Sequence, residues 1–232
     1  MDQLPSAKLG ARNQCSTLET NYVHRLAFSP DGQYLVLTLA RELRLWDCLA
    51  EKETRRLASP FARSLAFTRD CQRLVAGIFD GPVKVWDFSG ATRDREFKGH
   101  DWPVEGVGFS LDGRSVVACG PDIRVWDADA GEQLELLKPS TSGFESCAVS
   151  PDGRTFAVGH ADGAISLWSF GSLQQVALLR GHENSVRQLA FTADGERLIS
   201  ASQEQFRVWR AASFTEPSKP DQSNWPKPTG PF

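Results

Sequence analysis

The residues of this sequence with the greatest chemical potential are its four histidines and five cysteines. Such residues bind metals, transfer protons or act as nucleophiles, but each role needs partners at a defined spacing. The histidines have no carboxylate arrangement typical of a metal or acid–base site, and the cysteines include no C-x-x-C pair. No phosphate-binding glycine loop or G-x-S-x-G motif occurs either. We therefore expect no catalytic residue, metal site or cofactor, and no enzymatic activity. The residues in question are His24, His100, His160, His182, Cys15, Cys48, Cys71, Cys119 and Cys147.

The charge balance also restricts the partners. A net charge of -3 gives no general attraction to nucleic acid or anionic lipid. No stretch is long and apolar enough to span a bilayer, and residues 1–20 lack the apolar core of a signal peptide, so we expect a cytoplasmic protein without a membrane partner. A basic residue stands two positions before four tryptophans, where it either binds an anion or, as we favour, pairs with local carboxylates. These residues are Arg44, Lys84, Arg124 and Arg207.

The elements that position these residues come from a repeat of about 40 residues. Five tryptophans mark the period, at intervals of 40, 40, 42 and 41 residues, and each ends a strand-like run. A turn such as Pro30-Asp31-Gly32 precedes each run, although Cys71 replaces the glycine in the second repeat. Four strand-length segments per unit at this period predict the blades of a β-propeller. The five residues are Trp46, Trp86, Trp126, Trp168 and Trp209.

The outer strands decide whether the array closes into a ring. Segments 53–57, 94–98, 133–137 and 175–180 are predicted outer strands, and nothing after Trp209 resembles one. Residues 15–19 therefore complete the fifth blade if the ring is closed. Otherwise the five four-stranded blades form an open partial propeller whose bare faces allow self-association. We expect a flexible N-terminus over 1–14, the propeller over 15–210 and a proline-rich, disordered tail over 211–232.

With these motifs in view, the sequence resembles the WD-repeat (WD40) family over about residues 15–210. The resemblance lies in two Gly-His pairs, the turns of the Phe-Ser-Pro-Asp-Gly kind and three Trp-Asp pairs. It implies that a histidine, a serine or threonine, an aspartate and the tryptophan of a blade share hydrogen bonds. The matching residues are His100 and His182, and Asp80 and Asp162 six positions before a tryptophan, so that no repeat holds both types.

The residues that the repeat does not require are the candidates for function. Trp102 follows a Gly-His pair without a structural role in the pattern, and exposed tryptophans are enriched at binding hot spots. Aromatic residues recur in the corresponding loops, where they either bind a partner or pack on a neighbouring blade. The candidate partner-binding residues are Tyr22, Phe61, Asp101, Trp102, Phe144, Glu183 and Asn184.

These features predict a non-catalytic WD-repeat scaffold that binds a protein or peptide through the loops of one propeller face. An alternative is a partial propeller that remains from the regulatory or sensing part of a larger multidomain protein such as a kinase. A nucleic-acid or small-ligand binder is a less favoured third alternative.

Overall fold

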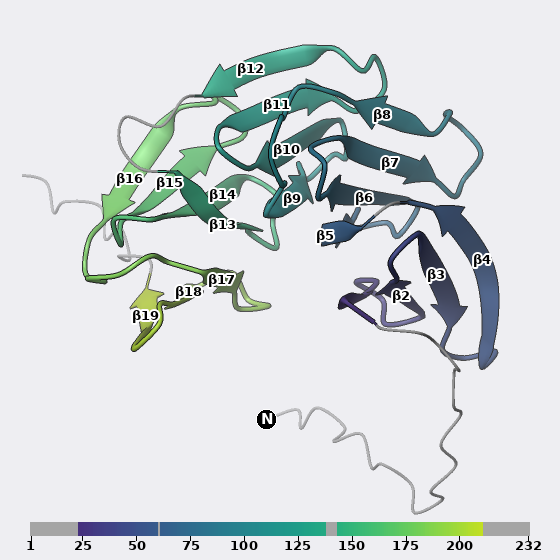
Figure 1. The fold of residues 1–232 in the computed structure, drawn as a ribbon, viewed down its shortest axis with the longest axis horizontal. Helices are drawn as coiled ribbons and strands as arrows, with labels where there is room; N and C mark the ends of the chain where they lie inside the picture. Colours follow the sequence, from purple (N-terminus) through teal and green to yellow (C-terminus); the bar gives the residue numbers. More distant parts are fainter. Residues whose placement is uncertain (1–22, 60, 138–142, 211–232) are drawn as a thin grey trace, which may run out of the picture.

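The computed structural model describes residues 23–59, 61–137 and 143–210, which form five antiparallel β-sheets arranged as an arc (Figure 1). Blade one contains β1 (Arg25–Phe28), β2 (Tyr34–Thr38), β3 (Glu42–Asp47) and β4 (Lys52–Ala58), and blade two contains β5 (Ala62–Phe67), β6 (Arg73–Ile78), β7 (Val83–Asp87) and β8 (Arg95–Phe97). Blade three contains β9 (Gly106–Phe109), β10 (Ser115–Cys119), β11 (Ile123–Asp127) and β12 (Gln133–Leu137). Blade four contains β13 (Phe144–Val149), β14 (Thr155–His160), β15 (Ile165–Ser169) and β16 (Gln175–Leu179), and blade five contains β17 (Gln188–Phe191), β18 (Arg197–Ala201) and β19 (Phe206–Arg210).

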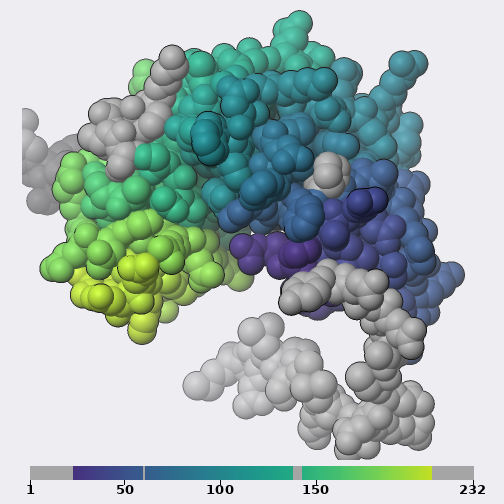
Figure 2. All heavy atoms as spheres, in the orientation of Figure 1, coloured from purple at the N-terminus to yellow at the C-terminus, as the bar shows by residue number. Residues whose placement is uncertain are grey.

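The blades share one up-and-down topology, in which the strands follow one another from the inside of the arc to its outside. The four predicted outer strands coincide with β4, β8, β12 and β16, which confirms them. Blade five has three strands among the residues described, and the predicted fourth strand, 15–19, lies outside them. The propeller is open, as one of the two predicted forms has it: Figure 2 shows the arc interrupted between yellow-green blade five and blue blade one. The predicted termini 1–14 and 211–232 also lie outside the described residues.

A conserved pattern of hydrogen bonds explains the turn between the first two strands of each blade. A serine or threonine hydroxyl bonds to the aspartate two residues later, for example Ser150 Oγ to Asp152 Oδ1 at 2.5 Å. The same carboxylate accepts the N–H of Arg154. These bonds hold the pKa of Asp152 below its usual value. Asp112, Asp152 and Asp194 are thus turn-formers, as predicted, and Cys71 adopts the left-handed φ of +60° that glycine takes in the other repeats.

The core lies between the blades, because each sheet has two apolar faces. We call the face that meets the following blade the leading face and the one that meets the preceding blade the trailing face. The leading face of blade one carries Val36, Leu43 and Leu45, which pack on Leu74 and Trp86 of the trailing face of blade two. Every framework tryptophan occupies this trailing-face position of its own strand. The repeat therefore recurs in the sequence because the interface between blades recurs in space.

Candidate functional site

Two kinds of connection meet at one end of the blades. They are the loops from an outer strand to the next inner strand and the turns between the second and third strands. A Cβ added at Gly81, in such a turn, would overlap the carbonyl oxygen of His100 in the loop that follows. Gly163 and His182 repeat this contact two blades later. The loop after each Gly-His pair is therefore held against the turn of the preceding blade.

Trp102 lies in the middle of such a loop and is 67% exposed. The loop is anchored on both sides, because His100 is buried and Val104 is completely buried between blades two and three. Val104 also donates its N–H to the carbonyl of Ile78, at 3.4 Å. Asp101 beside it is exposed. A large aromatic side chain is thus presented to solvent on a fixed backbone, which agrees with the sequence prediction for both residues.

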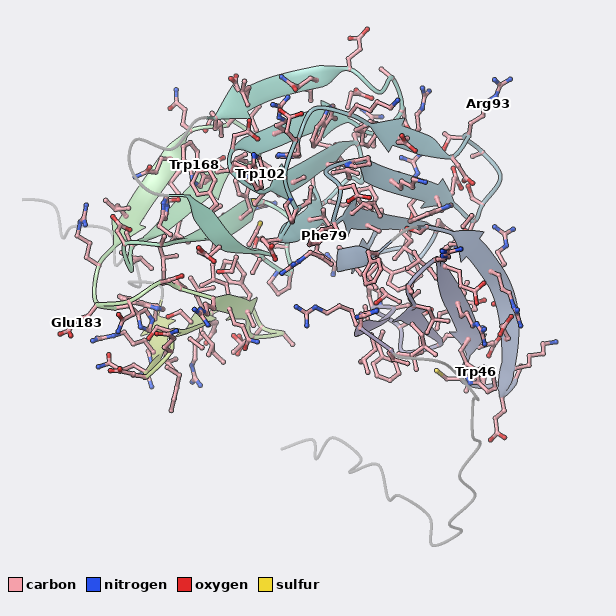
Figure 3. The ribbon with its side chains drawn as sticks, in the orientation of Figure 1. Trp46, Phe79, Arg93, Trp102, Trp168 and Glu183 are labelled. Carbon is pink, nitrogen blue, oxygen red and sulfur yellow. The ribbon has the colours of Figure 1, made fainter. Side chains whose placement is uncertain are left out.

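A second aromatic group lies on the neighbouring blades, and we call it the Phe61–Phe79 cluster: His24, Phe61, Arg63 and Phe79. The Phe79 N–H bonds to the carbonyl of Phe61 at 2.9 Å, and both side chains are exposed. The Arg63 guanidinium lies 5.7 Å from the centre of the Phe79 ring, and the His24 ring lies 4.9 Å from that of Phe61. Phe79 belongs to the same turn as Gly81, so this cluster continues towards Trp102. Figure 3 shows Phe79 and Trp102 over the inner part of the arc.

Phe79 was not among the candidates that the sequence provided. It follows a strand that ends in Ile78, so it reads as a further apolar residue of that strand rather than as part of an exposed turn. The corresponding positions of other repeats hold a small residue or a buried histidine, such as Gly120 or Ala161 after His160. A large ring in a turn that otherwise carries small residues is the feature that identifies it.

The structure contradicts one of the predicted partner-binding residues. Phe144 is only 6% exposed and packs in the core between blades three and four, with its ring 5.1 Å from that of His160. It begins an inner strand, where its side chain faces the preceding blade rather than solvent. Glu183 and Asn184 are exposed, but Figure 3 shows Glu183 at the outer edge of blade five, away from Trp102. Tyr22 lies outside the described residues.

The predicted histidine network is present in blade five. His182 Nε2 lies 2.7 Å from Ser200 Oγ, and the Trp209 indole N–H donates to the same oxygen at 2.8 Å. All these polar atoms lie at the trailing face, so the network ties the loop, the second strand and the third strand together. His182 Nδ1 is buried without a hydrogen-bond partner among the described residues, because no aspartate stands beside it.

Blade four contains a second network of the same chemistry, built from other positions. His160 Nε2 bonds to Ser166 Oγ at 2.8 Å, and Trp168 donates to that oxygen at 2.8 Å. Here the histidine belongs to the second strand and the serine to the third. Asp162, which the family pattern placed in the network, instead accepts the N–H of Ala164 within its turn. His160 therefore has a structural role that the Gly-His pattern does not predict.

In blade three the structure brings a histidine and an aspartate together, against the prediction that no repeat holds both. His100 Nδ1 lies 2.8 Å from Asp122 Oδ1, although the ring N–H is poorly directed for a hydrogen bond. The spacing rule missed Asp122 because the turn is two residues shorter than in blade four: Cys119 pairs with Ile123, whereas Gly159 pairs with Ile165. Asp80 makes no hydrogen bond or ion pair among the contacts that the described residues show.

The surroundings of the three buried histidines keep them neutral. Burial lowers the pKa of His182, and the positive charge of Arg207 lowers it further. Burial likewise lowers the pKa of His160 and of His100, opposed by the charge of Asp162 and of Asp122 respectively. The unfolded chain binds protons at these positions before the folded chain does, so stability is complete above the usual histidine pKa of 6.5 and falls as the pH drops below it.

We predict that Gln205→Asp raises the pKa of His182 and stabilises blade five by about 1 kcal/mol at neutral pH. Gln205 accepts a hydrogen bond from Arg207 just as Asp122 does from Arg124, so the new carboxylate would stand where Asp122 meets its histidine. Urea unfolding and NMR titration of the imidazole measure the two effects. Gln205→Asn, which adds no charge, is the control. An unchanged His182 pKa would show that the carboxylate does not reach the imidazole.

The basic residues of the third strands pair with local groups. Arg44 contacts Glu42 at 2.7 Å, Lys84 contacts Glu96 at 3.4 Å and Arg124 contacts Asp122 at 3.0 Å. Arg207 bonds to the amide of Gln205. Since partners on their own or the adjacent strand occupy these side chains, they form no continuous anionic-ligand surface.

The described segments contain no group of three or more histidine, cysteine or acidic side chains positioned to hold a metal ion. Across residues 23–59, 61–137 and 143–210 there is also no helix that is long and apolar enough to cross a membrane. The functional features of this part of the molecule are therefore its exposed loops and faces.

Comparison with known proteins agrees with this architecture. The family model of the WD domain, G-beta repeat, matches residues 12–47, 92–127, 131–169 and 173–210. It omits most of blade two, which lacks a Gly-His pair and the turn glycine. Protein groucho of Drosophila melanogaster is 28% identical over 213 residues, which cover 87% of this chain but only 29% of groucho. The chain thus spans less than a third of that relative.

A solved structure gives the same result for the fold. The crystal structure of the Cps50 (Swd1) beta-propeller domain of Myceliophteria thermophila superposes with a TM-score of 0.75 at 16% identity. The superposition covers 88% of this chain and 70% of that chain. WD-repeat propellers generally act as scaffolds for protein interaction. The repeats, the five antiparallel blades and the matches to the family model together show that this chain belongs to the WD-repeat family.

Proposed function

We propose that this protein is a non-catalytic scaffold that binds a peptide or protein segment on the surface formed by Trp102 and the Phe61–Phe79 cluster. Trp102 carries the proposal, because it is exposed on a loop whose two ends are buried. Such a side chain loses little conformational freedom on binding and buries a large area, as the anchors of protein interfaces do. A cytoplasmic location and action without a cofactor are part of the proposal.

The charges around the aromatic side chains indicate a partner of mixed polarity. Asp101 is exposed beside Trp102, while Arg63 lies over Phe79 and pairs with Glu105 at 3.1 Å. An apolar side chain of the partner would contact the rings, and polar groups around it would meet the acidic and basic side chains. This arrangement resembles an interface with an apolar centre and a polar rim.

We predict that Trp102→Ala weakens binding of a selected peptide by about 30-fold or more, the loss expected at a hot spot. The experiment selects ligands of the purified full chain from a displayed random peptide library and measures their dissociation constants by calorimetry. Phe79→Ala should weaken the same ligands. Arg93→Ala is the matched control, because Arg93 is exposed and lies far from Trp102 at the rim of the arc in Figure 3.

Two outcomes would contradict the proposal. Ligands that tolerate Trp102→Ala and Phe79→Ala would place the binding surface elsewhere. Retention on a polyanion resin that falls steeply with salt, in the absence of peptide ligands, would favour the nucleic-acid alternative.

A further inference from the structure

The two ends of the arc carry apolar faces that the described residues leave uncovered. On blade one, Leu26 is 61% exposed and Phe28 59%. On blade five, Phe206 is 77% exposed and Val208 50%, and Ile199 beside them is also exposed. Figure 1 shows these blades at opposite ends of the arc. Exposed apolar groups of this extent are unusual in a soluble protein unless another surface covers them.

The bare face of blade one is a trailing face with nothing in front of it. Leu26 and Phe28 occupy the positions of Leu189 and Phe191, and Trp46 that of Trp209. In blade five these residue types pack against the leading face of blade four. The same residue types at the same positions predict that blade one fits a leading face of the same kind.

The bare face of blade five is the complementary half of the same interface. Ile199, Phe206 and Val208 occupy the positions that Val36, Leu43 and Leu45 hold in blade one. Those three residues of blade one are buried against blade two, so the exposure on blade five reflects the lack of a following blade. β19 also has no neighbour on its outer side among the described strands, which leaves its backbone groups open to a further strand.

The size of the gap follows from the comparison with the solved propeller domain. That domain is covered to only 70% by this chain, and the remainder corresponds to roughly two repeats of the period seen here. A second copy of this chain brings five blades, more than such a gap accepts. We infer that the open end of the arc is a docking site for a partner polypeptide that supplies two WD-type blades.

In this complex the partner contributes a strand beside β19 and packs a trailing face on Phe206 and Val208. Its second blade packs a leading face on Leu26 and Phe28. The interface is distinct from the loop surface with Trp102, so either proposal can fail while the other stands.

The test uses this chain's own repeats as the probe. Residues 92–169 contain the outer strand β8 and all strands of blades three and four except the last, which is one outer strand and two blades in the order that the gap requires. Tagged residues 92–169 are produced together with the full chain, and we expect a complex with one segment per chain. In a parallel series, residues 92–127, 92–169 or 92–210 are joined after Arg210 to add one, two or three repeats. Only the two-repeat extension should give a monomer that no longer binds a hydrophobic dye and that unfolds at a higher temperature.

A pair of variants checks where the segment binds. Phe206→Glu should abolish the complex and the gain from the two-repeat extension, without unfolding the parent chain, because Phe206 is exposed there. Leu49→Glu should change neither, since Leu49 is exposed in a turn away from both bare faces. The proposal is overturned if the parent chain already excludes the dye, as a monomer covered by its own segments or as a dimer of two copies. A one-repeat or three-repeat extension that closes the arc better than two would also overturn it.

Discussion

Phe156→Ala should lower the free energy of unfolding by about 3–5 kcal/mol, the largest loss that we expect from a single truncation in this chain. Phe156 is completely buried on β14, between blades three and four. Its ring stacks on Trp168 at 6.3 Å between centres and meets Phe170 edge-on at 5.0 Å. Removal of the ring leaves a cavity between two sheets that other contacts hold apart, and it also removes the aromatic pairs.

Chemical unfolding followed by tryptophan fluorescence and circular dichroism measures this loss. Phe79→Ala is the matched control, since it deletes the same ring from an exposed turn and should change stability by less than about 0.5 kcal/mol. Phe156→Leu should fall between the two. A loss below about 1 kcal/mol for Phe156→Ala would mean that blades three and four do not share the continuous core described above.

The repeat made the fold predictable because each tryptophan marks the same contact between neighbouring blades. Trp126 and Trp168, for example, lie on trailing faces that differ in sequence but not in position. The strand order and the outer strands follow from that period, since one blade cannot bury both faces alone. Whether the array closes does not follow from it, because closure depends on how much array is present rather than on any one repeat.

The candidate site was predictable only in part. Trp102 was recognised because it stands outside the repeat pattern, and its exposure agrees with that prediction. Phe144 also stood outside the pattern but is buried, because it begins a strand instead of lying in the loop before it. Phe79 and Asp122 were missed for a shared reason. Both lie in turns between the second and third strands, whose length varies between repeats, so a fixed spacing from the tryptophan does not locate them.

Gly81→Ala should destabilise the protein by about 3 kcal/mol or more and should also weaken binding at Trp102. Gly81 has a φ of +105°, which is outside the region that residues with a side chain readily adopt. The added methyl group would in addition overlap the carbonyl oxygen of His100. Since this oxygen belongs to the backbone, the whole loop that carries Trp102 must move.

Gly32→Ala separates these two causes. Gly32 also has a positive φ, +72°, but a Cβ there would meet no atom within 4 Å, so only the backbone cost of about 1 kcal/mol applies. Thermal and urea unfolding of both variants, with the affinity of a Trp102-dependent peptide, give the comparison. If Gly81→Ala and Gly32→Ala lose equal stability and the peptide still binds to both, the turn of blade two does not position the Trp102 loop. If only Gly81→Ala loses affinity, contact between turn and loop is what presents Trp102 to a partner.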